Sequence, residues 1–106
     1  MEACVKARMR ANWSSAILVC GKCSKKLGGG FGAAGGTPLA KALRQAAGLK
    51  KGRKAAAGVV AVKCLGVCPK RAVTVIDGRN PGEWLIVRAG ADVASVSRQL
   101  GLTAQA

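Results

Sequence analysis

The sequence predicts a single α/β domain in which a four-stranded mixed sheet carries helices packed on it. Its 106 residues fit one small core. In the first half, two β-branched apolar runs flank a helical pattern, which implies a parallel pair of strands with a right-handed crossover. In the second half, two more runs joined by turn residues imply an antiparallel hairpin, and a final helical pattern follows. The expected order of elements is therefore β-α-β-β-β-α.

The first half contains the predicted parallel pair. Residues 15–20 form a short apolar run that indicates a buried strand, and residues 21–36 contain seven glycines, which predicts a flexible loop. Thr37 and Pro38 are suited to open a helix that extends to about residue 47. Residues 58–63 are expected to form a second strand that is buried on both faces.

The second half contains the predicted hairpin. After a loop at 64–69, strands are expected over 72–76 and 84–87, joined by turn residues. Asp92 is positioned to cap a last helix that ends at Gly101. We expect residues 16–102 to form the domain, with a poorly ordered basic extension at 1–15 and a tail at 103–106.

Two tight pairs of cysteines, Cys20-x2-Cys23 and Cys64-x3-Cys68, follow the two strands of the parallel pair, and the chain has no histidine. Because parallel strands end at the same edge of a sheet, we expect both pairs to emerge side by side. The sequence therefore predicts a metal site made of sulfur ligands. The fifth cysteine, Cys4, lies in the basic extension and is expected to be a free thiol.

Three kinds of chemistry fit this pattern. The first is an iron–sulfur centre that transfers electrons, and the second is a structural Cys4 zinc site, although zinc folds usually pair two C-x2-C knuckles. The third is a thiol–disulfide oxidoreductase, which would use Cys20 and Cys23 alone. That motif normally begins a helix directly, whereas a glycine-rich loop is expected here, and it leaves Cys64 and Cys68 unexplained.

The order of elements, with Val19-Cys20 opening the first loop and the segment Lys63-Cys64-Leu65-Gly66-Val67-Cys68-Pro69 after the second strand, resembles the thioredoxin-like [2Fe–2S] ferredoxins. The resemblance covers residues 16–102. It implies a thioredoxin-like sheet and one [2Fe–2S] cluster held by Cys20, Cys23, Cys64 and Cys68. Family members separate their first two ligands more widely than Cys20 and Cys23. An electron carrier of this kind has no catalytic constellation of its own.

A formal charge of +14, with no acidic residue between Ala3 and Ile76, indicates an acidic partner. We expect an acidic-surfaced redox protein that docks near the cluster. Basic residues flank both cysteine pairs and would favour the negatively charged cluster, although with this composition some cations must fall near any site: Lys22, Lys25, Lys26, Lys63, Lys70 and Arg71. Homodimerisation through a sheet edge is a further expectation left open.

Two other motifs receive a structural interpretation. Residues 30–35 match G-x-G-x-x-G, but no acidic residue follows before Asp77, so glycine-rich packing is favoured over dinucleotide binding. The basic run at 50–54 could contact nucleic-acid phosphates. No aromatic residue is interleaved with this run, so a solvated connection is favoured.

The expected compartment is the cytoplasm, where thiols stay reduced and available to metals. No apolar run approaches the roughly 20 residues that a membrane span needs, and the stretch after the basic start is shorter than the core of a signal peptide.

Overall fold

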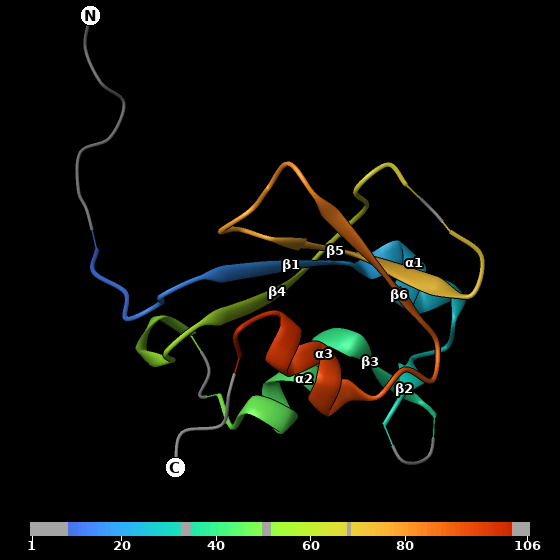
Figure 1. Ribbon diagram of the computed structural model, residues 1–106, viewed down its shortest axis with the longest axis horizontal. Coiled ribbons are helices and arrows are strands. Elements are labelled where there is room, and N and C mark those ends of the chain that lie inside the picture. Colours follow the sequence, from blue (N-terminus) through green and yellow to red (C-terminus); the bar gives the residue numbers. More distant parts are fainter. Residues whose placement is uncertain (1–8, 33–34, 50–51, 68, 103–106) are drawn as a thin grey trace, which may run out of the picture.

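The computed structural model describes residues 9–32, 35–49, 52–67 and 69–102, and within them a four-stranded mixed sheet forms the centre of the molecule (Figure 1). The strands are β1 (Ala16–Cys20), β4 (Gly58–Val62), β5 (Ala72–Asp77) and β6 (Trp84–Arg88), in the order β4-β1-β5-β6. β1 is parallel to β4 and antiparallel to β5, and β5 and β6 form an antiparallel hairpin. The predicted mixed sheet, with its parallel pair and its hairpin, is thereby confirmed.

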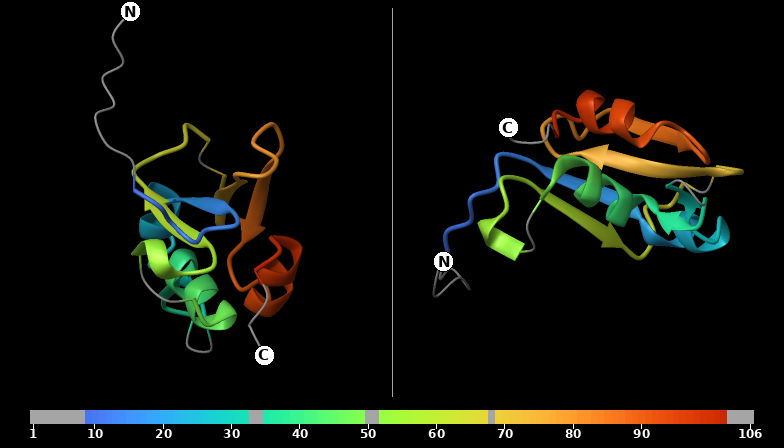
Figure 2. Two further views of the ribbon diagram at one scale, coloured as in Figure 1. Left: turned by 90° about the vertical axis from the view of Figure 1, so that its left-hand side faces the viewer. Right: turned by 90° about the horizontal axis from the view of Figure 1, so that it is seen from below.

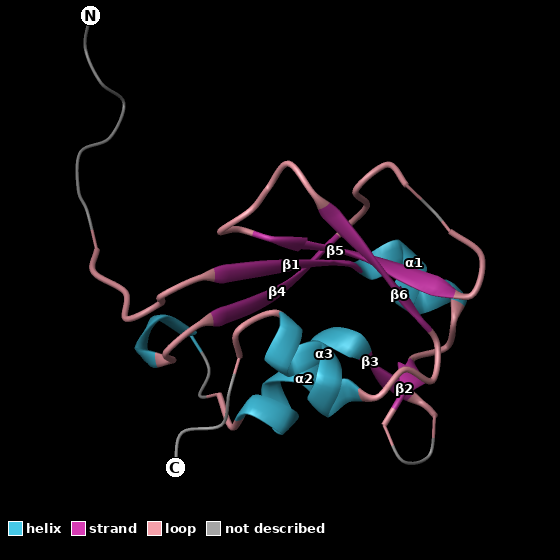
Figure 3. Ribbon diagram, viewed as in Figure 1, coloured by secondary structure: helices cyan, strands magenta, loops and turns pink. Residues whose placement is uncertain are grey.

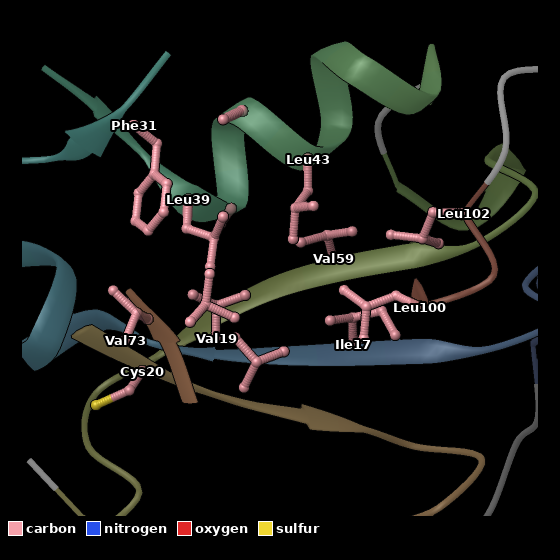
Figure 4. Packing of buried hydrophobic residues seen from close by; sticks show 14 of the residues in the cluster. Ile17, Val19, Cys20, Phe31, Leu39, Leu43, Val59, Val73, Leu100 and Leu102 are labelled. Carbon is pink, nitrogen blue, oxygen red and sulfur yellow. The ribbon is translucent and has the colours of Figure 1, made fainter. Parts of the chain in front are cut away.

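Helices α2 (Leu39–Ala47) and α3 (Val93–Gln99) pack against each other and cover one face of the sheet (Figures 1 and 2). Gly48 ends α2 in a left-handed conformation, with φ 64°, as its place after the apolar pattern predicts. Ile17 and Val19 point from β1 toward the helices, where Leu39 and Leu43 meet them (Figure 4). Cys20 lies at the end of β1 with its sulfur directed away from these helices.

The burial predicted for both faces of β4 is wrong. Val59 is buried, but Val60 keeps 37% of its surface exposed and Ala61 is exposed as well. β4 stands at the edge of the sheet, and Val60 and Ala61, which point to opposite faces, are both left uncovered. A parallel strand is buried on both faces only where helices cover both, which does not happen here.

The flexible loop predicted over 21–36 is also wrong. Helix α1 (Gly21–Lys26) begins directly after Cys20, and two short strands, β2 (Gly30–Phe31) and β3 (Thr37–Pro38), pair with each other (Figure 3). Two buried side chains hold this segment: Cys23 faces inward from α1, and Phe31 is 1% exposed. Because Pro38 belongs to β3, it precedes α2 at the N-cap position instead of opening its first turn.

The short 3-10 helix η1 (Gly52–Lys54) holds part of the predicted extension in place. The backbone N–H of Asn12 donates to the Arg53 carbonyl, and that of Ser14 donates to the Ala56 carbonyl, both at 2.7 Å. Residues 1–8 and 103–106 lie outside the described residues, and so do Cys4 and Cys68. Within the described ranges, no helix combines the length and the apolar character that a membrane span needs.

Candidate metal centre

Cys20 is the last residue of β1 and stands at the N-cap position of α1, and its side chain is fully buried. The next residue, Gly21, lies against the end of β4, because a Cβ at position 21 would stand only 2.6 Å from the carbonyl oxygen of Val62. The backbone N–H of Lys22 donates to the Lys63 carbonyl at 3.0 Å. The start of α1 and the chain leaving β4 are therefore in direct backbone contact, and this contact brings the segment that begins at Cys64 to the start of α1.

Cys23 lies in α1, one turn beyond Cys20, and is 2% exposed. Its Sγ donates a hydrogen bond to the carbonyl oxygen of Val67 at 3.6 Å. The Oγ1 of Thr74, a fully buried residue of β5, donates to the same oxygen at 3.0 Å. The segment after β4 is thus fastened both to α1 and to β5.

Cys64 opens that segment and is exposed. Its Sγ accepts a hydrogen bond from the backbone N–H of Gly66 at 3.3 Å. Gly66 adopts φ 87°, a left-handed conformation that a residue with a Cβ rarely takes, so glycine is what allows the chain to fold back onto the sulfur. Backbone N–H groups that donate to cysteine sulfur tune metal-bound sulfur.

The surroundings of Cys20 favour a thiolate. Burial raises the pKa of its thiol, but hydrogen bonds from the backbone N–H groups of Cys23 and Leu65, from the Cys23 side chain and from the Lys22 backbone outweigh it, so the pKa lies below the ordinary value of 9.0. Leu65 directly follows Cys64 in the chain. The sulfur of Cys20 is therefore held by backbone groups from both cysteine segments.

A cavity of about 300 Å³ opens next to Cys23. A larger cavity, of about 360 Å³, does not border the thiols. The smaller cavity lies between α1 and the residues that lead into β5, and it is lined by Cys23, Lys26, Leu27, Pro69, Lys70, Arg71 and Ala72. Three of these residues are cationic and none is acidic. Arg71 adopts φ 53°, an uncommon conformation for a residue with a side chain.

Of the four predicted ligands, the structure brings Cys20 and Cys23 to the segment that begins at Cys64. Cys68 lies outside the described residues, so its place in the site stays a prediction. Within the described part of the chain, no group of three or more Cys, Asp or Glu side chains is arranged to hold a metal ion.

Sequence reasoning missed two residues that shape the site. Thr74 was assigned only to a strand, and nothing in its neighbours indicated that its hydroxyl would fix the Val67 carbonyl. Gly21 was counted among the loop glycines, whereas it is the point at which α1 approaches β4. The spacing of Cys23 and Leu27, four residues apart, was the available signal for a helix here.

Comparison with models of protein families, with curated proteins and with solved structures found no match for this chain.

Proposed function

We propose that this protein is an electron carrier that holds one [2Fe–2S] cluster on Cys20, Cys23, Cys64 and Cys68 in a thioredoxin-like fold. The observation that carries the proposal is the meeting of the two cysteine segments, in which Cys20 accepts a hydrogen bond from the Leu65 backbone and Cys23 donates one to Val67. The succession β1, α2, β4, β5, β6 and α3, with β1 parallel to β4, supports the thioredoxin-like assignment.

The donor chemistry of the described residues fits such a cluster. Cysteine thiolates are the usual ligands of [2Fe–2S] clusters, and hydrogen bonds to sulfur tune their reduction potentials. Here the sulfurs of Cys20 and Cys64 both accept backbone hydrogen bonds. When bound, the cluster would accept and release single electrons.

The remaining residues of the site would shield and balance the cluster. Burial of Cys20 and Cys23 keeps water from two of the ligands. Lys26, Lys70 and Arg71, which line the cavity beside Cys23, supply positive charge close to a site that carries negative charge in both oxidation states. The same cations suit a redox partner with an acidic surface, because complementary charge speeds encounter and orients docking.

The test is elemental and spectroscopic analysis of anaerobically purified protein. We expect two iron and two sulfide ions per chain, visible absorption, and an electron paramagnetic resonance signal that appears on reduction. Stoichiometric zinc in a colourless protein would instead indicate the structural Cys4 site, and it would reject the electron carrier.

A thiol–disulfide oxidoreductase is the second candidate, and one observation favours it. The sequence predicted a loop after Cys20, but α1 begins there directly, which places Cys20 and Cys23 as a C-x-x-C pair at the start of a helix. Such a pair would form one internal disulfide, passing two electrons and two protons to a disulfide substrate that leaves as two thiols. Metal-free protein with this reversible couple, retained when Cys64 and Cys68 are both changed to Ser, would favour the second candidate over the first.

A further inference from the structure

A tryptophan and several cations gather at the end of the sheet opposite the cysteines. Cys20 is at the carboxyl end of β1, whereas Trp13 precedes β1 and packs against Gly58, the first residue of the parallel strand β4. The Nε1–H of Trp13 donates to the Gly52 carbonyl in η1 at 2.9 Å. Figure 1 shows η1 beside the chain that enters β1, far from α1. Folding thus places Trp13 beside a basic connection that lies 39 residues away in sequence.

The indole of Trp13 is fixed in position and still accessible. Its six-membered ring occupies the space that a Cβ at position 58 would need, so only glycine there allows the ring to lie on the strand. The side chain nevertheless keeps 36% of its surface exposed. It lines a cavity of about 360 Å³ together with Arg44, Gly52, Ala57, Gly58, Val59 and Val60. This volume is within the range of pockets that accept small molecules.

Arg44 supplies positive charge to the same cavity. Its Nη1 donates to the Val59 carbonyl at 2.8 Å, which holds the guanidinium at the outer edge of β4. Arg44 also lines a second cavity, of about 580 Å³, with Lys41 on the same helix. Arg53 and Lys54 of η1 are exposed nearby in the chain that Trp13 contacts. We call Trp13, Lys41, Arg44, Arg53 and Lys54 the Trp13 surface.

Carboxylates do not neutralise this surface within the described residues. Asp77 and Glu83 belong to the β5–β6 hairpin, which lies on the other side of β1 from β4. Asp77 is paired with Arg79 at 2.9 Å, the one ion pair among the residues that the structure describes. Asp92 precedes α3 and instead accepts a hydrogen bond from Ser95.

We propose that the Trp13 surface binds single-stranded nucleic acid, with an unpaired base stacked on Trp13 and the phosphates held by Arg44, Arg53 and the neighbouring lysines. An exposed aromatic ring beside cations is the arrangement with which proteins bind single strands, because any base offers a flat face for stacking. The sequence disfavoured nucleic acid for want of an aromatic near the basic run, and Trp13 supplies one. An acidic protein would match the charge but would leave the indole without a planar partner.

Fluorescence of two single-tryptophan variants tests the proposal. Trp84→Phe leaves Trp13 as the only reporter, and Trp13→Phe leaves Trp84, which is 42% exposed on β6 and donates to the Pro81 carbonyl. At low salt, thymidine or uridine oligonucleotides of about ten residues should quench the first variant saturably and leave the second unchanged. Either oligomer supports the proposal, and their relative affinities distinguish DNA from RNA. The proposal does not depend on the cluster. If a bound metal quenches tryptophan fluorescence, Trp84 serves as the internal control.

Two further variants separate stacking from charge. Gly58→Ala places a methyl group in the space that the Trp13 ring occupies, and it should abolish the quenching of Trp13 fluorescence by the oligonucleotides. Arg53→Gln combined with Lys54→Gln should keep the quenching at low salt but reduce the salt dependence of log K by about 1.4, if each cation contacts one phosphate. Inorganic polyphosphate should compete with the oligonucleotides without quenching Trp13.

Three results would overturn the proposal. Equal quenching of both single-tryptophan variants would show that the contact is not at Trp13. Binding of polyphosphate and oligonucleotide with equal affinity per charge would reduce the surface to a general polyanion site. Quenching by polyglutamate but by neither oligonucleotide would assign the surface to an acidic protein.

Discussion

The Sγ of Cys23 lies 3.6 Å from the carbonyl oxygen of Val67, although 44 residues separate them. This contact joins α1 to the segment that follows β4, and the Oγ1 of Thr74 donates to the same carbonyl oxygen at 3.0 Å. The two cysteine segments therefore meet over the end of β5. The position of the segment after β4 depends on this shared carbonyl.

Thr74→Val should loosen the cysteine segment without opening the core. The change removes one hydroxyl donor and keeps the side-chain volume, so we expect the free energy of unfolding to fall by about 1 kcal/mol in urea denaturation. Thr74→Ser is the matched control, because it retains the hydroxyl. Thr74→Val with the stability and the metal content of the unaltered protein would mean that the Val67 carbonyl is not held by this hydrogen bond.

Gly21→Ala should separate α1 from β4. Its Cβ would stand 2.6 Å from the Val62 carbonyl oxygen, which cannot move without disturbing the parallel pair. We expect a loss of about 1–3 kcal/mol and a lower metal content after purification. Gly36→Ala is the control, since a Cβ there meets nothing within 4 Å and no positive φ is required. Equal behaviour of the two variants would contradict the close approach at Gly21.

Phe31→Ala should strongly destabilise the domain. Phe31 is 1% exposed and packs in the core with Leu39, so its removal leaves a cavity, and we expect a loss of about 3–5 kcal/mol. Val67→Ala, at an exposed position, is the control. A loss below about 1 kcal/mol for Phe31→Ala would restore the interpretation of residues 21–36 as a flexible loop.

Asp77 should make stability depend on pH in the acid range. The hydrogen bond from the Arg79 side chain lowers the pKa of Asp77 below its ordinary value of 3.8, against a smaller opposing effect of burial. Its stabilising contribution is thus present above the pKa of the unfolded state and is lost as the pH falls through the lower pKa of the folded state. Asp77→Asn should be less stable than the unaltered protein at neutral pH, and this difference should shrink and then vanish as the pH falls through the pKa of Asp77 in the folded state.

Urea unfolding at several pH values measures this difference. Glu83→Gln serves as the control, because Glu83 forms no ion pair within the described residues. A constant difference between Asp77→Asn and the unaltered protein across the acid range would contradict the role of the ion pair.

Hydrophobic periodicity was enough to predict the four strands of the main sheet and the two longer helices. Val19 and Val59 belong to short apolar runs of the kind that buried strands show. Leu39 and Leu43 recur at helical spacing. Helix α1 was missed because the glycines beyond residue 27 suggested a loop that was extended back to Gly21. A six-residue helix offers only one such spacing, that of Cys23 and Leu27, which is a weak signal on its own, and the helix depends on the packing of Cys23.

The candidate site was predictable only in part. Placing Cys20 at the end of a strand parallel to the one before Cys64 follows from topology, which the sequence pattern indicates. Two other features do not follow from topology: the hydrogen bond between Cys23 and Val67, and the packing of Trp13 on Gly58. Each depends on contacts between residues that are far apart in the sequence.

Iron and sulfide content of the single Cys→Ser variants tests the central claim most directly. If one centre joins the two cysteine segments, Cys64→Ser and Cys68→Ser should lose the cluster as fully as Cys20→Ser and Cys23→Ser do, while Cys4→Ser keeps the iron, the sulfide and the visible spectrum. Retention of full iron and sulfide in both Cys64→Ser and Cys68→Ser would contradict the claim, because the second cysteine pair would then take no part in the centre.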